Sequence, residues 1–176
     1  MKLLGTIAAA ILLSTSGAAL AEGGALNDPQ IATVALTAHQ IDVDRGKLAQ
    51  KKTKNDAVKQ FADQMVTDHT QGMNEVLALA KKLGVKPEES AVTKSLKAGA
   101  KKTAAQLEKL SGVAFDKAYV DAEVDYHKAV IDAVNKVLLP AVKNEEVKQA
   151  LVATTPTLQG HLVHAQQVQA ALATAK

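Results

Sequence analysis

Histidine and aspartate side chains occupy positions that the apolar pattern of this sequence would otherwise give to the core. In the segment MVTDHTQGM, residues 65–73, His69 lies on a stripe of apolar residues spaced three and four apart. His127 and His161 interrupt later stripes in the same way, and Asp42 flanks the first one. Burying such groups costs several kcal/mol each unless they are paired or bind a metal ion. We therefore consider these four residues a candidate metal site.

The four residues also lie at similar depths in their expected helices. Each follows the expected start of its helix at Asp28, Asn55, Val113 or Asn144, by 14 residues for Asp42, His69 and His127 and by 17 for His161. At about 1.5 Å per residue, 14 residues correspond to about 21 Å. In a helical bundle the four side chains should therefore meet in one central layer.

The ligand types favour zinc or copper, with one ion bound and no organic cofactor. Imidazole suits both metals, and the helices of bundles commonly carry metal sites. Met65 and Met73 flank His69 by four residues and offer soft sulfur, although filling the core is their simpler role. His39 and His164 lie one turn from Asp42 and His161, where we expect partial exposure. We assign no catalytic residue.

A purely structural polar layer is the alternative interpretation. In it, the histidines, Asp42, Thr154 and the Tyr126 hydroxyl bond to one another or to buried water and fix the helix register. The protein would then be a non-enzymatic envelope interaction or stress protein. A metal-dependent oxidoreductase is a weaker rival, because it also needs an open coordination position and a path for substrate.

A di-iron carboxylate site is disfavoured by the spacing around the histidines. Such sites need a Glu-x-x-His motif on two helices. The residues three positions before His69, His127 and His161 are apolar, namely Val66, Val124 and Leu158. The surviving version is a mononuclear site dominated by histidine.

Capping residues and periodicity predict an all-α chain. Helices are expected over about 29–53, 56–83, 90–110, 113–139 and 144–172, with Pro140 stopping the fourth. Pro156 lies inside the last segment, so that helix either kinks there or restarts with Thr155 as its cap. The arrangement fits a ferritin-like four-helix bundle with a helical crossover between the second and third long helices. An up-down bundle and a dimeric coiled coil remain alternatives.

The N-terminal residues 1–21 read as a secretory signal peptide, with cleavage expected before Glu22. Its apolar stretch is too short for a transmembrane anchor. Residues 22–176 should then form a single exported, periplasmic domain. The chain has no cysteine, which excludes lipid attachment through an N-terminal cysteine and thiolate ligands, and its formal net charge of +3 argues against nucleic-acid binding. The expected partner is an unidentified envelope component, with homo-oligomerisation left open.

Several ordered segments resemble the bacterial family named domain of unknown function 4142. They are DVDRGKLA from Asp42, VKQFA from Val58, MV at 65–66, DH at 68–69, FD at 115–116, Tyr119, His127, Pro156, Leu158 and HL at 161–162. The resemblance implies a ferritin-like fold, and no activity is assigned to the family. Members are often labelled outer-membrane proteins, which suggests a periplasmic location peripheral to that membrane. They usually carry Glu where this chain has Asp42.

Overall fold

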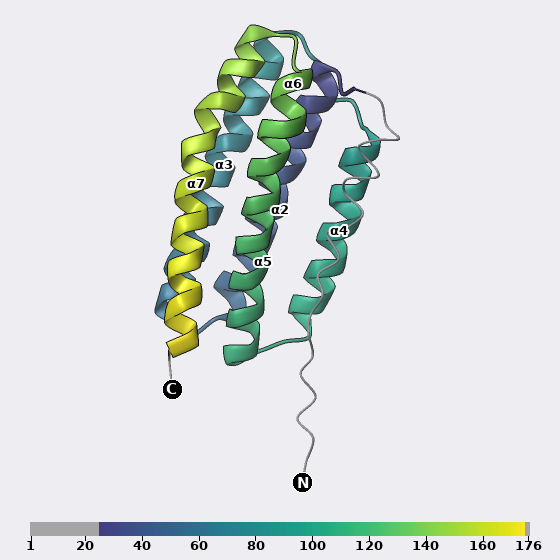
Figure 1. Cartoon of the computed structure of the whole chain (residues 1–176). Helices are drawn as coiled ribbons and strands as arrows, with labels where there is room; N and C mark the ends of the chain where they lie inside the picture. The colour runs from purple at the N-terminus through teal and green to yellow at the C-terminus, as the bar shows by residue number, and fades with distance from the viewer. Residues whose placement is uncertain (1–24, 175–176) are drawn as a thin grey trace.

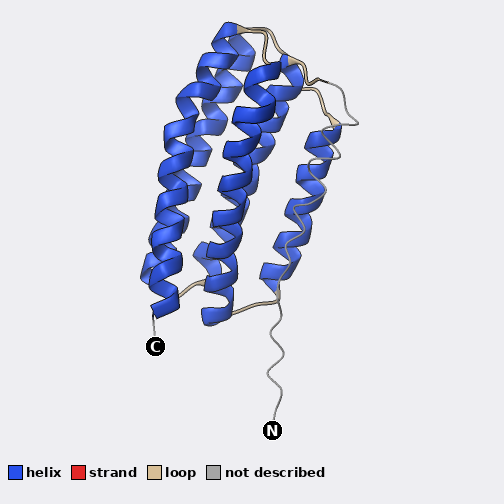
Figure 2. Cartoon of the chain, viewed as in Figure 1, coloured by secondary structure: helices blue, strands red, loops and turns tan. Residues whose placement is uncertain are grey.

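The computed structural model describes residues 25–174, and every regular element in that range is helical (Figure 2). The all-α prediction is therefore confirmed for these residues. The elements are α2 (Asp28–Lys52), α3 (Asp56–Lys82), α4 (Ala91–Glu108), α5 (Gly112–Ala133), the π-helical turn η1 (Val134–Leu138), α6 (Leu139–Ala141) and α7 (Glu145–Thr174).

The helix starts follow from side-chain caps that the sequence displays. Asn27 accepts a hydrogen bond from the Gln30 backbone N–H, and the Gln30 side chain returns one to Asn27, which completes a capping box. Asn55 and Ser90 cap α3 and α4 by accepting a hydrogen bond from the Val58 and Thr93 backbone N–H groups, respectively. Gly84 follows α3 with a φ of 64°, the left-handed conformation that favours glycine after a helix.

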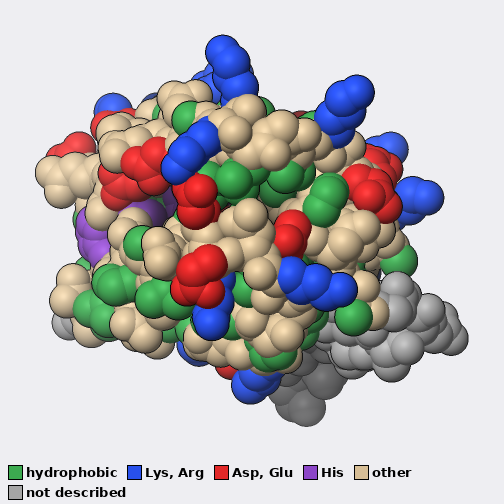
Figure 3. All heavy atoms as spheres, turned by 90° about the horizontal axis from the view of Figure 1, so that it is seen from above, with side chains coloured by type: hydrophobic (Ala, Val, Ile, Leu, Met, Phe, Trp, Pro, Cys, Tyr) green, Lys and Arg blue, Asp and Glu red, His purple; other side chains and the backbone are tan. Residues whose placement is uncertain are grey.

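The long helices are arranged as two antiparallel pairs, α2 with α3 and α5 with α7 (Figure 1). α4 connects the two pairs: it runs from the end of the molecule where α3 finishes to the end where α5 begins, and it packs mainly on α2. A helical connection between the second and third long helices is therefore present, as predicted. Seen from above, charged side chains of both signs surround the end of the molecule, with hydrophobic side chains visible between them (Figure 3).

The apolar core is divided into two clusters along the bundle. One contains Phe61, Met65, Phe115 and Tyr119, all fully buried, and other residues from the same end of the helices. The second cluster lies at the opposite end, and its buried members are Leu26, Ile31, Val34, Val134, Leu138, Val147, Leu151 and Leu158. Each long helix passes from one cluster to the other through its predicted polar residue. The polar layer therefore separates two apolar cores.

Pro140 lies inside the last turn of the helix that was predicted to end before it, and the helix finishes one residue later, at Ala141, which corrects the sequence-based prediction. The helix widens into η1, where the Leu139 N–H donates to the Val134 carbonyl five residues back, and it then continues to Ala141. Proline removes a donor that a regular α-helix would need. The longer-range bonding of a π-turn shifts the hydrogen-bond register just before Pro140, so the helix includes the proline and ends one residue after it.

Pro156 lies inside α7, which runs unbroken from Glu145 to Thr174. Of the two alternatives for this segment, a new helix capped by Thr155 is therefore wrong. The Asn144 side chain caps α7 by accepting from the Glu146 and Val147 N–H groups. Pro156 itself is exposed.

The predicted signal peptide, residues 1–21, lies outside the described part of the chain. Within that part, each helix is too short or too polar to cross a bilayer.

We expect Pro156→Ala to stabilise the protein, because the new N–H can donate to the Val152 carbonyl within α7. Proline inside a helix costs up to about 3 kcal/mol, so a gain of about 1 to 3 kcal/mol in the free energy of unfolding should appear in urea titrations. Thr157→Ala, at the exposed neighbouring position, is the control and should change stability by less than about 0.5 kcal/mol. A loss of stability in Pro156→Ala would instead show that α7 needs the proline in order to pack.

Candidate metal centre

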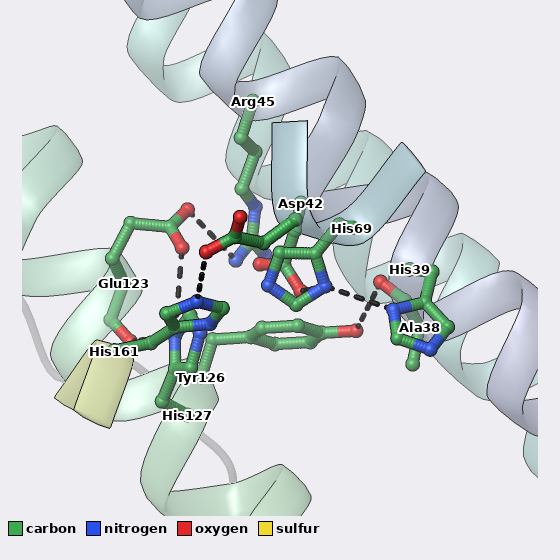
Figure 4. A network of polar contacts seen from close by, with 10 residues as sticks. Ala38, His39, Asp42, Arg45, His69, Glu123, Tyr126, His127 and His161 are labelled. Carbon is green, nitrogen blue, oxygen red and sulfur yellow. Dashed lines mark hydrogen bonds and ion pairs between the residues drawn. The ribbon is translucent and has the colours of Figure 1, made fainter. Parts of the chain in front are cut away.

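The polar layer draws side chains from all four long helices (Figure 4). They are His39, Asp42 and Arg45 on α2, His69 on α3, Glu123 and His127 on α5, and His161 on α7. All except His39 are at most 7% exposed. The layer is therefore a buried cluster of ionisable groups in the middle of the bundle.

The three predicted histidines converge. The ring centroids are 5.0 Å apart for His69 and His161, 5.5 Å for His127 and His161, and 5.7 Å for His69 and His127. One nitrogen from each ring lies within 4.8 Å of the other two, so the group could hold a metal ion. The prediction that equal helix depth brings these imidazoles together is confirmed.

One nitrogen of each imidazole is held by a neighbour outside this trio. The three contacts, each 2.9 Å long, join His69 Nδ1 to His39 Nδ1, His127 Nδ1 to the Glu123 backbone carbonyl, and His161 Nε2 to Asp68 Oδ2. Carbonyl and carboxylate oxygens accept, so His127 Nδ1 and His161 Nε2 carry the protons. The opposite nitrogens of these two rings therefore present lone pairs.

The second nitrogen of each ring is buried and makes no hydrogen bond within residues 25–174. These atoms are His69 Nε2, His127 Nε2 and His161 Nδ1. Buried polar atoms without partners are rare and costly, whereas a metal-bound imidazole normally has one nitrogen on the metal and the other held by a hydrogen bond. The donor set therefore fits a metal ion coordinated by three histidines.

Asp42 lies in the predicted layer but not in the histidine trio. Its Oδ2 atom is 3.4 Å from His69 Nδ1, on the side of the ring that also meets His39. Asp42 forms a second potential metal-binding group with Glu123 and His127, whose donor atoms lie within 4.8 Å of one another. His127 belongs to both groups, the three histidines and the group of Asp42, Glu123 and His127. Asp42 therefore lies next to the three-histidine group without being part of it.

Glu123 and Arg45 are buried members of the cluster that the sequence analysis missed. Glu123 is fully buried, and its Oε1 atom lies 3.7 Å from Arg45 Nη1. Glu123 precedes His127 by four residues, so both side chains share one face of α5. A search for carboxylates four positions before each histidine, as well as three, would have found it. The Arg45 guanidinium also lies 4.5 Å from the centre of the Tyr126 ring.

His39 is half-buried as expected, but its position outside the layer was predicted wrongly, because it contacts His69 directly. Gly72 on α3 makes this contact possible: a Cβ atom there would lie 2.5 Å from His39 Cε1. The glycine in MVTDHTQGM therefore leaves room for the ring that holds His69. His164, in contrast, bonds to Gln64 at 2.7 Å, away from the trio.

Asp68, the neighbour of His69 in the sequence, bonds to another helix through His161 on α7. Two further side chains of the proposed structural layer, Tyr126 and Thr154, bond to backbone carbonyls and not to the histidines or Asp42. The Tyr126 hydroxyl donates to the Ala38 carbonyl at 3.3 Å, and Thr154 donates to the Ala150 carbonyl within its own helix. Thr154 therefore contributes nothing to the layer.

Burial shifts the pKa values of His39, Asp42, His69 and His127 in the direction that favours their uncharged forms. It lowers the pKa of His69 to about 2, helped by the neighbouring His39, His127 and His161. Burial also lowers the pKa of His39 and of His127, although a nearby glutamate opposes the shift in each case. Burial, together with the Glu123 carboxylate, raises the pKa of Asp42 well above its usual value. Neutral imidazoles are the form that binds metal ions.

Comparison with protein-family models places the chain in a family. The model described as domain of unknown function DUF4142 matches residues 13–168, so the chain belongs to that family, as its resemblance indicated. No curated protein and no solved structure matches the chain.

The pKa shifts predict how the metal-free protein responds to acid. His39, His69 and His127 have lower pKa values in the folded state, so the unfolded chain binds more protons below about pH 6.5 and the free energy of unfolding falls. Asp42 has the opposite effect, because its raised pKa favours the folded state as the pH falls towards about 4. The effect of the three imidazoles on stability is larger than the opposite effect of the one carboxyl. Each net proton that the unfolded chain binds in excess changes the free energy of unfolding by about 1.4 kcal/mol per pH unit.

We therefore expect the melting temperature, measured in EDTA, to fall steadily between pH 7 and pH 5. His69→Leu should reduce the slope, because it removes the imidazole with the largest shift. His164→Leu is the matched control and should keep the slope of the unmodified protein. A melting temperature that stays constant over this range would show that the imidazoles are not held neutral by burial.

Proposed function

We propose that this protein is an exported, periplasmic bundle with ferritin-like architecture that binds one transition metal ion through His69, His127 and His161. Asp42 is the adjacent carboxylate. Zinc and copper are the metals that the ligands fit best, because all three donors are imidazole nitrogens. The ferritin-like assignment is supported by two antiparallel helix pairs joined through a long helical crossover.

The observation that supports metal binding is the set of three buried ring nitrogens without hydrogen-bond partners. A layer that only fixed helix register would be expected to satisfy these atoms, because each unsatisfied buried group costs about 1 to 3 kcal/mol. In this cluster the nitrogens that face away from the trio are satisfied instead. A metal-bound imidazole has the same arrangement, because one ring nitrogen binds the metal and the other is held by a hydrogen bond.

A structural layer in an envelope interaction or stress protein is the second candidate. The observation in its favour is that the layer joins the helices directly: His39 and His69 connect α2 to α3, and His161 and Asp68 connect α7 to α3. In that case the same contacts would define the register of the bundle without any ligand.

Metal binding predicts a stabilisation that depends on His127. A ligand that binds only the folded state adds about 2.7 kcal/mol at a hundred times its Kd, or roughly 5 to 10 °C for a domain of this size. Zinc or copper should therefore raise the melting temperature of metal-free protein at pH 7, and His127→Leu should abolish the increase. His164→Leu, in the histidine that lies outside the cluster, should retain it. Unchanged melting of verified metal-free protein in excess zinc and in excess copper would favour the structural layer.

Export predicts that the mature protein begins at Glu22. The basis is the small-residue triplet at 19–21 after an apolar stretch. Intact-mass spectrometry of the periplasmic fraction should give the mass of residues 22–176. Recovery of only the full-length chain, in the cytoplasmic fraction, would contradict the proposal.

A further inference from the structure

The buried cluster contains a second group of possible metal ligands beside the three histidines (Figure 4). Asp42, Glu123 and His127 each offer one donor atom, and these atoms lie within 4.8 Å of one another. All three residues are at most 2% exposed. They come from α2 and α5, whereas the histidine trio comes from α3, α5 and α7. We refer to this second group as the carboxylate position.

The oxygens of the carboxylate position lack hydrogen-bond partners. Asp42 Oδ1 and both carboxylate oxygens of Glu123 are buried and make no hydrogen bond within residues 25–174. Glu123 Oε1 lies 3.7 Å from Arg45 Nη1, and Glu123 Oε2 lies 3.6 Å from His127 Nδ1. Both distances are longer than a hydrogen bond. Arg45 therefore balances the charge of Glu123 without occupying the lone pairs of its oxygens, which stay free for a metal ion.

The carboxylate position and the histidine trio have one donor in common, the Nε2 atom of His127. The Nδ1 atom of this ring lies 2.9 Å from the Glu123 backbone carbonyl and donates to it, so Nε2 carries the free lone pair. Nε2 is buried and has no hydrogen-bond partner in the described part of the chain. Because one lone pair binds one ion, the two groups cannot both be complete at the same time.

The donor types of the two groups suit different metals. Three imidazoles favour zinc or copper, whereas carboxylate oxygens favour manganese(II) and other harder ions. A carboxylate can bind such an ion through one or both of its oxygens. The cavity between α4 and the rest of the bundle, to whose lining Asp42 contributes, has room for the water molecules that harder ions keep.

We infer that Asp42, Glu123 and His127 form a second metal position that takes manganese(II), and that zinc or copper in the histidine trio excludes manganese from it. The inference rests in part on the proposed function, because His127 also belongs to the proposed zinc site. Charge favours the same exclusion. A second divalent ion would add its charge to those of the first ion and of the buried Arg45 guanidinium. The cluster therefore binds one ion at a time, and the type of ion decides the position.

Manganese should bind more weakly than zinc, for two reasons. Divalent manganese lies below zinc in the general order of metal affinities. Burial, together with the Glu123 carboxylate, also raises the pKa of Asp42 well above its usual value. An ion at the carboxylate position therefore displaces the Asp42 proton, because carboxylate ligands are deprotonated. Zinc should accordingly displace manganese, and not the reverse.

Manganese(II) is the probe for the test, and electron paramagnetic resonance is the readout. The sharp signal of manganese in water broadens when the ion binds to a protein, so the loss of that signal counts the bound ions. Metal-free protein at pH 7 should bind one manganese ion per chain. Added zinc should release this ion one for one, because zinc takes the Nε2 atom of His127.

Glu123→Gln and His161→Leu are the matched variants, since each removes a donor from one group only. Loss of a group that merely orients a ligand typically lowers metal affinity by about 10- to 100-fold, so loss of a ligand should cost at least about tenfold. Glu123→Gln should weaken manganese binding by this factor and keep the zinc-induced rise in melting temperature. His161→Leu should lose the zinc response and keep manganese binding. Asp42→Asn, which leaves Arg45 and Glu123 paired, repeats the first test if Glu123→Gln does not fold.

The outcomes separate the two positions. No manganese binding, or binding that both carboxylate variants leave intact, would refute the carboxylate position. Equal loss of zinc and manganese in His161→Leu would place manganese in the histidine trio and overturn the inference. Zinc and manganese bound to one chain at the same time would refute the shared donor. Manganese binding as expected, without any effect of zinc on melting, would instead refute the histidine trio and leave the carboxylate position standing.

Discussion

The structure depends on holding six ionisable side chains out of water at one level of a helical bundle. Asp42, Arg45, His69, Glu123, His127 and His161 are each at most 7% exposed. Such groups are tolerated only when neighbours or ligands satisfy them, since removing one partner of a buried pair leaves a charge that costs several kcal/mol. The helices must therefore share one register, and the apolar core is confined to two clusters on either side of the layer.

Close packing of α2 on α3 makes the layer rigid on one side. Gly46 and Gly72 allow these two helices to approach so closely that a methyl group at either position would collide with its neighbour. The approach brings His39 onto His69 and sets the orientation of the His69 ring. Hydrogen bonds from outside the trio orient the other two rings as well. Precise placement of the nitrogens therefore comes from groups that would not themselves touch a metal ion.

The sequence predicted helix positions and the depth of the histidines well, because both are set along the chain. Caps such as Asn27 and Asn55 define where helices begin, and residue counts from those caps define the level of the layer. Contacts between helices were harder to predict, since they depend on how each helix is rotated about its axis. His39 was placed outside the layer because its contact with His69 depends on the space above Gly72, on another helix. Glu123 was missed because only the position three residues before His127 was considered. The π-turn before Pro140 follows from local hydrogen bonding that a simple stop rule for proline does not include.

The two sides of the bundle differ in how tightly their helices pack. Between α2 and α3, glycine removes side-chain volume so that backbones can meet, and the result is a fixed ring geometry. On the side of α4, a cavity of about 1400 Å³ remains, and His39, Asp42, Arg45 and His69 of the same polar cluster contribute to its lining. Filling that space would bury more apolar surface at about 25 cal/mol per Å². The closely packed pair fixes the ring geometry of the cluster, whereas the loosely packed side gives the same cluster a space beside it.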